Sequence, residues 1–391
     1  MRALLAGARR LQPHLIALTR LLVQAESPSG SKSAVDACVA LAAAHARQLG
    51  GRVKLHRPAA ADGLGDVLEV RFGPRRPSGP GPLLLLGHLD TVWPLGTLQT
   101  MPFRQSRGRL WGPGTLDMKT GVAMAFTAIE LLNEARLLQR EIVLLLTTDE
   151  EIGSTASRPI TESIAKTCAA VYVLEPAQGL AYKTARKGIG NWRIDVKGVA
   201  AHAGVDYENG ANAIRELARA IEKVSGWTEL KRGLTVSVGV AGGGTRSNVI
   251  PAHAWAEVDA RIARRADGPR LARKFAALKP VDPRCALIVS GGINRPPMER
   301  SRGTVDLFRQ AQALARELGF VLSEASTGGG SDGNFTAALG IPTLDGMGAV
   351  GEGAHAPHES VFVPHLAPRT ALLAGMLICY SGSAVTVSRS R

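Results

Sequence analysis

The stretch EIVLLLTTDEEIGS, residues 141–154, decides the fold, because an uninterrupted apolar run ends there in adjacent carboxylates. Such runs are typical of strands buried on both faces of a parallel sheet. Asp149, Glu150 and Glu151 follow the run, and carboxylates at the end of a buried strand lose hydration and repel one another. The stretch therefore predicts a buried strand with a positively charged partner at its carboxyl end.

Two further apolar runs share this design. Residues 83–86 (LLLL) lead into GHLDTV, and residues 169–174 (AAVYVL) lead into EP. With a helical pattern over 119–135 between them, the runs predict an α/β fold with a largely parallel sheet flanked by helices. Sites in such sheets lie outside the carboxyl ends of the strands. The side chains expected to converge there are His88, Asp90, Asp149, Glu150, Glu151 and Glu175.

A metal is the simplest positive partner, because no lysine or arginine lies at these three strand ends. Asp117 follows a glycine-rich turn in GPGTLDMKTG (112–121), and His355 lies in the loop GEGAHAPHES (351–360). Two histidines and four carboxylates fit two divalent cations, with zinc the best match and cobalt or manganese sharing its ligand preferences. The Asp90 carboxylate is expected to accept the ring N–H of His88 and fix its tautomer.

Length and composition limit the class of protein. A chain of 391 residues allows two domains, and 45% hydrophobic with 20% charged residues is typical of a soluble enzyme-sized protein. The net charge of +14 does not indicate nucleic-acid binding, because the arginines are scattered and aromatic residues make up only 4%. The four cysteines lie far apart, and no apolar run suits a membrane span or a secretion signal. A reduced, cytoplasmic protein without membrane contact is expected.

The middle third of the chain has a different pattern. Strands are expected at 189–197, 234–241, 253–263 and 285–290, and helices at 209–224 and 268–278. The order β-α-β-β-α-β is that of a ferredoxin-like unit. We therefore expect a discontinuous catalytic, metal-binding domain from residues 1–184 and 297–391. Residues 185–296 would form an inserted dimerisation or lid domain.

Taken together, the motifs resemble the co-catalytic zinc peptidase family. In chain order they are GHLDTV, GPGTLDMKTG, TTDEEIGS, LEP, GVAAHAG, TGGGSDGNF and GEGAHAPHES. The family includes carboxypeptidase G (glutamate carboxypeptidase), acetylornithine deacetylase, succinyl-diaminopimelate desuccinylase and aminoacylase. TGGGSDGNF and the segment after it are most similar to the carboxypeptidase G branch.

The resemblance assigns the metal ligands position by position. It implies one zinc site at His88 and Glu175. It implies a second at Glu151 and His355, with Asp117 bridging the two ions. The neighbouring His358 is expected to have no metal role.

The resemblance also implies the catalytic groups and a backbone feature. Glu150 would be the general base that takes a proton from the attacking water, and Asp90 would support His88. A cis peptide bond is expected between Asp117 and Met118. His202, in GVAAHAG, is similar to the family histidine that reaches the active site of the partner subunit and stabilises an oxyanion, which implies a homodimer.

A free carboxylate on the substrate is implied by a further group of residues. They resemble positions that grip a carboxylate through a guanidinium fork and backbone N–H groups. These candidates are Asn248, Arg261, Gly329, Gly330 and Ser331. The substrate would be a small molecule or short peptide, whose side chains the sequence does not specify.

The predicted function is a metal-dependent amide hydrolase that cleaves next to a C-terminal amino acid, as glutamate carboxypeptidase does. The alternative is an N-acyl amino acid deacylase, such as an acetylornithine deacetylase or desuccinylase relative. A non-catalytic binding protein with the same fold is disfavoured, because neither Glu150 nor any expected ligand is missing.

Overall fold

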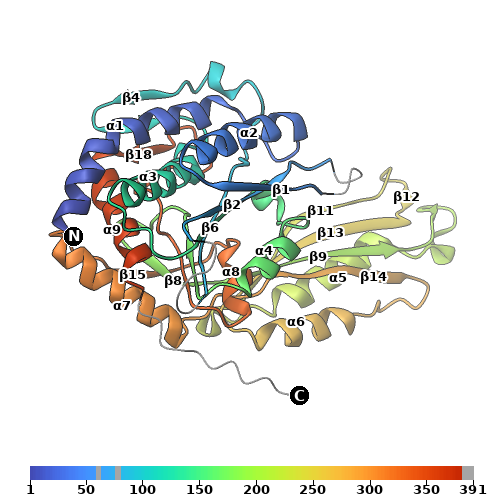
Figure 1. The fold of residues 1–391 in the computed structure, drawn as a ribbon. Coiled ribbons are helices and arrows are strands. Elements are labelled where there is room, and N and C mark those ends of the chain that lie inside the picture. Colours follow the sequence, from blue (N-terminus) through green and yellow to red (C-terminus); the bar gives the residue numbers. More distant parts are fainter. Residues whose placement is uncertain (59–62, 75–80, 381–391) are drawn as a thin grey trace. The chain divides into compact units, whose positions relative to one another are not determined.

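The computed structural model describes residues 1–58, 63–74 and 81–380, which form two compact units (Figure 1). Unit 1 contains Met1–Ala185, Arg300–Ser326 and the chain from Ser331 onward. Unit 2 contains Arg186–Glu299 and Thr327–Gly330. Among the described residues, no helix is both long and apolar enough to span a membrane.

Unit 1 is built on a mixed six-stranded sheet with the order β1-β2-β6-β3-β7-β16. The strands are β1 (Arg52–His56), β2 (Val67–Phe72), β3 (Leu83–His88), β6 (Ile142–Thr147), β7 (Ala170–Val173) and β16 (Thr343–Leu344). The three apolar runs of the sequence form β3, β6 and β7, which are parallel, with β16 parallel to β7.

The expectation of a largely parallel sheet holds for these four strands, and the six-stranded sheet as a whole is mixed. β1 is antiparallel to β2, and β2 is antiparallel to β6. The chain between β1 and β2 is too short for a crossover helix, so the two strands can pair only in opposite directions. Strand β1 has no apolar run that would predict it, because its residues are polar or only partly buried, as is usual at a sheet edge.

Both faces of this sheet are covered. Leu83 and Leu85 pack in one apolar cluster with residues of helices α1 (Arg2–Gln24), α3 (Thr120–Glu134) and α9 (Leu366–Ile378). Leu84 and Leu86 point to the other face, where they pack with residues of α4 (Arg158–Ala165). Alternate side chains of one strand therefore serve two cores, which is why the run is apolar at every position.

Three further α-helices of unit 1 are α2 (Lys32–Gln48), α7 (Arg302–Glu317) and α8 (Gly333–Ala338). A short helical turn at Glu150–Ile152 follows β6. Residues of α2 and α7 belong to the same apolar cluster as those of α1 and α9.

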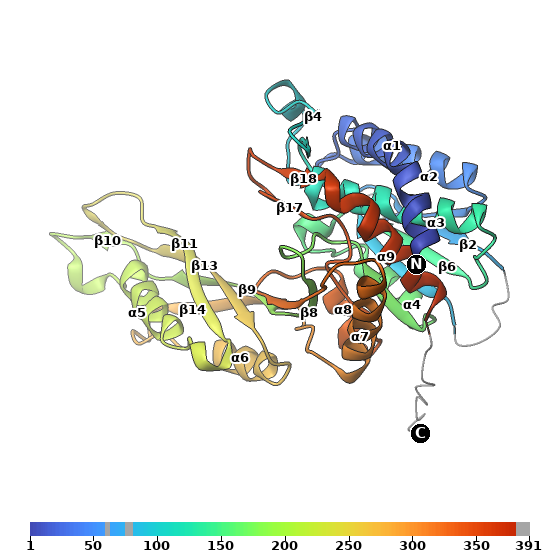
Figure 2. The ribbon, with the colours of Figure 1, turned by 90° about the vertical axis from the view of Figure 1, so that its left-hand side faces the viewer.

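Unit 2 has its own sheet and core (Figure 2). Its elements are β9 (Gly188–Lys197), α5 (Ala213–Ser225), β11 (Thr235–Gly243), β13 (His253–Ile262), α6 (Asp267–Ala276) and β14 (Ala286–Arg295). The element order is the expected β-α-β-β-α-β, and the sheet order is β11-β13-β9-β14, with every pair antiparallel. Trp192 of β9 stacks on Phe275 of α6 at 4.3 Å between ring centroids.

The close approach of α3 to the end of β7 gives a test of the unit 1 core. A Cβ atom added to Gly121 would lie 2.2 Å from the backbone oxygen of Leu174, which cannot rotate away. We expect Gly121→Ala to lower the free energy of unfolding by about 1–3 kcal/mol, as overpacking does. Urea unfolding measures this change.

Gly30→Ala is the matched control, because a Cβ there meets no atom within 4 Å. Its effect should stay within about 0.5 kcal/mol, as for most surface substitutions. Equal stability of the two variants would contradict the packing described for α3.

Candidate metal centre

The first part of the centre forms where three parallel strands end together. His88 is the last residue of β3 and pairs with Thr147 at the end of β6, while Glu175 follows β7. His88 is 1% exposed and Glu175 is 7% exposed. The imidazole Nε2 of His88 lies 3.7 Å from Oε1 of Glu175. These two side chains therefore meet at the strand ends, whereas Asp149, also expected there, accepts the backbone N–H groups of Ala156 and Ser157 instead.

The tautomer of His88 is fixed by a backbone group. Nδ1 of His88 lies 3.0 Å from the backbone oxygen of Asp90, and 3.5 Å from its carboxylate Oδ1. A carbonyl can only accept, so Nδ1 carries the proton and Nε2 is the nitrogen that faces the cluster. The expected Asp90 partner is correct, but its main chain makes the shorter contact.

The Asp90 carboxylate organises the turn that carries the two glutamates. It is fully buried and accepts the Ser29 hydroxyl at 2.7 Å. It also accepts the backbone N–H of Glu150 at 3.3 Å and that of Glu151 at 3.1 Å. These N–H groups begin the short turn at Glu150–Ile152, so Asp90 sets the direction of both side chains.

Asp117 lies between the two histidines. Its Oδ1 is 3.3 Å from Nε2 of His88, and its Oδ2 is 3.3 Å from Nε2 of His355. The same nitrogen of His355 is 3.3 Å from Oε2 of Glu151. The Asp117–Met118 peptide bond is cis, as the resemblance implied. One carboxylate thus presents a separate oxygen to each histidine.

His355 is carried by a small second sheet, whose strands β17 and β18 lie side by side in Figure 2. Its order is β17-β18-β5-β4, formed by Gly351–Glu352, Ser360–Phe362, Arg109–Trp111 and Arg104–Ser106. The chain leaves β5 into the turn of Asp117, and the connection between β17 and β18 carries His355. His355 has a left-handed backbone conformation with φ 61°, which is uncommon for a residue with a side chain.

The carboxylates raise the pKa of both histidines. Hydrogen bonds to Asp117 and Glu151 raise the pKa of His355 to about 10. Burial lowers the pKa of His88, but its bonds to Asp117 and Asp90 outweigh burial and hold that pKa well above its usual value. Burial raises the pKa of Asp117, but the hydrogen bonds to His355 and His88 outweigh burial and lower that pKa. The centre strongly favours bound positive charge.

The donor set fits divalent cations. Single ligand atoms of His88, Asp117 and Glu151 lie within 4.8 Å of one another, as do those of His88, Glu150 and Glu175. Oε1 of Glu151 is buried without a hydrogen-bond partner among the described residues. Imidazole nitrogens mixed with carboxylate oxygens suit zinc, and an unsatisfied buried carboxylate oxygen suits a cation that would bind it. Distance alone does not separate Glu150 from Glu175 as a ligand.

Glu359 is a residue of the centre that the sequence pattern did not reveal. Its carboxylate is fully buried and accepts backbone N–H groups of the Asp117 turn. Its position in the same motif as His355, GEGAHAPHES, was the available signal. His358, in contrast, is exposed and belongs to neither ligand cluster.

His202 and Asn248 lie together in unit 2. They belong to the segments that form the two-stranded sheet of β10 (Ala201–His202) and β12 (Val249–Ile250), and the oxygen of Asn248 accepts the Ala203 N–H at 2.9 Å. Nδ1 of His202 lies 3.2 Å from the backbone N–H groups of Gly204 and Val205. Since Nδ1 accepts these bonds, the neutral ring carries its proton on Nε2.

The remaining candidates already have partners. Arg261 binds Asp259 through Nε and Nη2, both at 2.9 Å, and its Nη1 lies 3.4 Å from the oxygen of Gly328. The oxygens of Gly329 and Gly330 accept from Nη1 of Arg186 at 3.3 and 2.9 Å. In unit 1, the buried hydroxyl of Ser331 donates to Asp345 at 2.6 Å.

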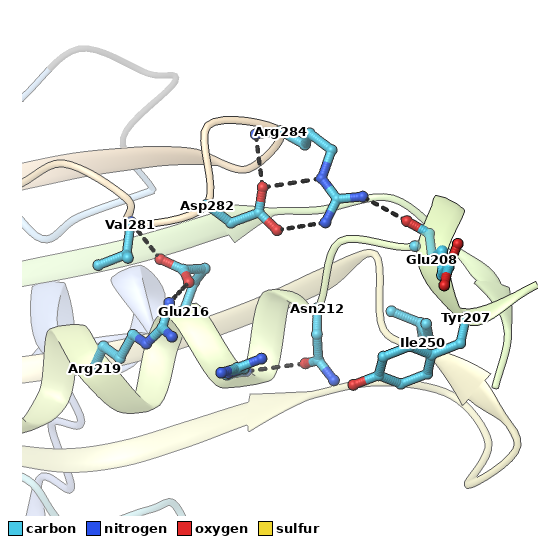
Figure 3. A pocket seen from close by; sticks show the side chains of 11 residues that line it. Tyr207, Glu208, Asn212, Glu216, Arg219, Ile250, Val281, Asp282 and Arg284 are labelled. Carbon is cyan, nitrogen blue, oxygen red and sulfur yellow. Dashed lines mark hydrogen bonds and ion pairs between the residues drawn. The ribbon is translucent and has the colours of Figure 1, made fainter.

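Unit 2 also contains a cavity of about 460 Å³ beside α5 (Figure 3). Four of its charged side chains are paired: Glu216 binds Arg219 and the Val281 N–H, and Asp282 binds Arg284. No residue predicted for the site lines this cavity. The candidate metal ligands lie instead in unit 1.

Known proteins are similar to this chain in sequence and in fold. Carboxypeptidase G2 of Pseudomonas sp. (strain RS-16) is 30% identical over 386 residues, which cover 95% of this chain and 90% of that protein. A succinyl-diaminopimelate desuccinylase of Leptothrix cholodnii is 29% identical over 361 residues, covering 85% of this chain and 90% of that protein.

The solved structure of aminopeptidase PepT from Bacillus cereus has a TM-score of 0.78 at 24% identity, with 94% of this chain and 98% of that chain covered. At that identity the likeness concerns the fold alone. Residues 84–378 match the family described as Peptidase family M20/M25/M40. The resemblance inferred from the motifs is confirmed: the chain belongs to peptidase family M20/M25/M40, a family of metal-dependent hydrolases.

Proposed function

We propose that this chain is a dimetal hydrolase that cleaves the amide bond next to a C-terminal amino acid with a free carboxylate. The observation that carries the proposal is the position of Asp117, whose two oxygens each lie 3.3 Å from a different histidine. A bridging carboxylate between two nitrogen ligands is what two neighbouring cations require. The 30% identity to a protein named carboxypeptidase G2 favours glutamate-carboxypeptidase-like activity.

The proposed ligands divide into two pairs and a bridge. His88 and Glu175 would hold one zinc ion, and Glu151 and His355 the other, with Asp117 shared. Cobalt or manganese could replace zinc at such ligands. When bound, the two cations would polarise the amide carbonyl and make a water molecule acidic enough to attack near neutral pH.

Glu150 is the proposed general base. Its carboxylate would accept a proton from the attacking water and deliver it to the nitrogen of the leaving amine, so that no proton is lost or gained overall. Asp90 would keep this side chain in place by accepting its backbone N–H. The division of roles between Glu150 and Glu175 comes from the family motif.

His202 would donate a hydrogen bond from Nε2 to the carbonyl oxygen as negative charge develops there. This role agrees with the tautomer set by Gly204 and Val205. We further propose a homodimer formed through unit 2, with His202 serving the site of the partner subunit. The edge strand β11, paired only with β13 in its sheet, offers a surface for that association.

The substrate carboxylate would be held by Asn248, Arg261 and the loop of Gly329, Gly330 and Ser331. At Arg261 it would compete with Asp259 for the guanidinium group. The hydroxyl of Ser331 is engaged by Asp345, so this residue would contribute through the shape of its loop.

An N-acyl amino acid deacylase is the second candidate, because the desuccinylase relative is almost as similar as the carboxypeptidase. The two activities share the centre and differ in which side of the amide is recognised. Zinc-loaded protein should therefore be tested against acyl-glutamates, dipeptides, acetylornithine and succinyl-diaminopimelate. We expect the highest kcat/KM for acyl-glutamates, and a preference for acetylornithine or the succinyl substrate would establish the deacylase instead.

Glu150→Gln is the control for this assay. The amide keeps the shape of the side chain but cannot accept a proton, so metal content and KM should persist while kcat falls by about 10²–10⁴-fold. Turnover near the wild-type value would remove Glu150 as the base.

Metal binding should release protons. The pKa of His355 is raised to about 10, so below that pH its ring is protonated until a cation displaces the proton from Nε2. Zinc affinity should thus rise with pH between 6 and 8, by about tenfold per unit for each displaced proton. Calorimetry in buffers of different ionisation enthalpy counts these protons.

His355→Ala should release fewer protons and lose one of two zinc equivalents. His358→Ala is the matched control in the same loop and should behave like the wild type. Zinc binding that is independent of pH would contradict the assignment of His355.

Two inactive variants test the action of His202 across a dimer. In an equal mixture of His202→Ala and Glu150→Gln, about half of the dimers are mixed, and each would hold one intact site. Activity should recover to about a quarter of the wild-type value. Pairing Glu150→Gln with a Glu150→Gln/His202→Ala double variant should recover none. Absence of recovery in the first mixture, despite demonstrated subunit exchange, would show that His202 does not act across the interface.

A further inference from the structure

The buried carboxylate of Glu359 binds four hydrogen-bond donors at once. Oε1 accepts the backbone N–H groups of Leu116 at 2.7 Å and Asp117 at 3.1 Å. Oε2 accepts the N–H of Gly114 at 3.0 Å and the indole N–H of Trp93 at 2.8 Å. The side chain is fully buried, and every one of these partners is neutral.

These bonds hold one loop against another. Glu359 ends the loop that carries His355, directly before β18. Three of its four partners lie on the turn that ends in Asp117, directly after β5, and the fourth, Trp93, lies in the segment after β3. Strand pairing places β18 beside β5, with Ser360 opposite Trp111, so both loops leave the same end of the small sheet.

The two proposed metal sites depend on different parts of the fold. His88 and Glu175 follow β3 and β7, which are paired in parallel within the six-stranded sheet. His355 stands on a connection between two short strands, with half of its side chain exposed. Besides the contacts of His355 to Asp117 and Glu151, the bonds of Glu359 anchor this loop to the described part of the chain.

We propose that Glu359 is the positioning residue that sets His355 against Asp117, and so forms the site that Glu151 completes. The site of His88 and Glu175 shares Asp117 but has its other two ligands at the ends of β3 and β7, so it depends less on Glu359. The inference rests on the proposed metal ligands and adds a residue to which no metal or catalytic role has been given.

Glu359→Gln tests the inference by metal content. The glutamine oxygen can accept one pair of donors, but its NH₂ group would face the other pair, so the two loops would separate. Loss of such a supporting hydrogen bond typically weakens metal affinity about 10–100-fold. We expect zinc affinity to fall by that factor at the site of His355 and Glu151, and to fall less at the site of His88 and Glu175.

The readouts are zinc equivalents at buffered free zinc and the visible absorption of the cobalt-loaded protein. The variant should retain one equivalent where the wild type retains two, and half of the cobalt spectrum should be lost. Trp93→Phe, which removes a single donor and keeps an aromatic ring, should give a smaller loss at the same site.

Glu216→Gln is the matched control, because Glu216 is also a buried glutamate that accepts a backbone N–H, from Val281 in unit 2. It should keep both equivalents. Two unaltered sites in Glu359→Gln and Trp93→Phe would overturn the inference, as would an equal loss at both sites. Asp117→Asn tests the proposed ligand set separately from the role of Glu359. If this variant leaves zinc binding intact, the ligand set itself is wrong.

Discussion

The dominant physical constraint in this molecule is the gathering of carboxylates at one edge of a buried sheet. Taken alone, they would repel one another and lose their hydration. The structure offsets the repulsion and the lost hydration in two ways. Asp90 and Glu359 are surrounded by neutral N–H and O–H donors and are fully satisfied by the protein. Asp117, Glu151 and Glu175 face histidine nitrogens and are suited to cations.

The apolar packing around the centre fixes the strand ends that carry these side chains. Because β3, β6 and β7 are buried on both faces, their ends are held by two cores and cannot shift easily. A buried lysine adds to this fixation: Nζ of Lys119 donates to the backbone oxygens of Leu22 at 2.8 Å and Ala25 at 2.9 Å. Burial lowers the pKa of that amine. It joins the end of α1 to the turn that carries Asp117.

Unit 2 has a separate core, and its candidate residues differ in kind from those of the centre. Arg261 and His202 lie on strands or turns, and each already has a protein partner that fixes its orientation. Because these side chains are already held in place, they would lose little conformational freedom on binding a substrate. Under the proposed function, the centre would carry out the hydrolysis and these groups of unit 2 would contact the substrate.

The sequence by itself determined the three central strands, the β-α-β-β-α-β order of unit 2 and the residue types of the centre, because apolar runs and their terminal carboxylates are local features. It did not reveal that β1 and β2 pair antiparallel, nor that the main chain of Asp90 sets the tautomer of His88. The family resemblance implied that His355 and Asp117 share a site, but the contact between them and the four donors to Glu359 are visible only in the fold. Those contacts connect segments far apart in the chain, and no local pattern of residues encodes which distant backbone groups a buried carboxylate will meet.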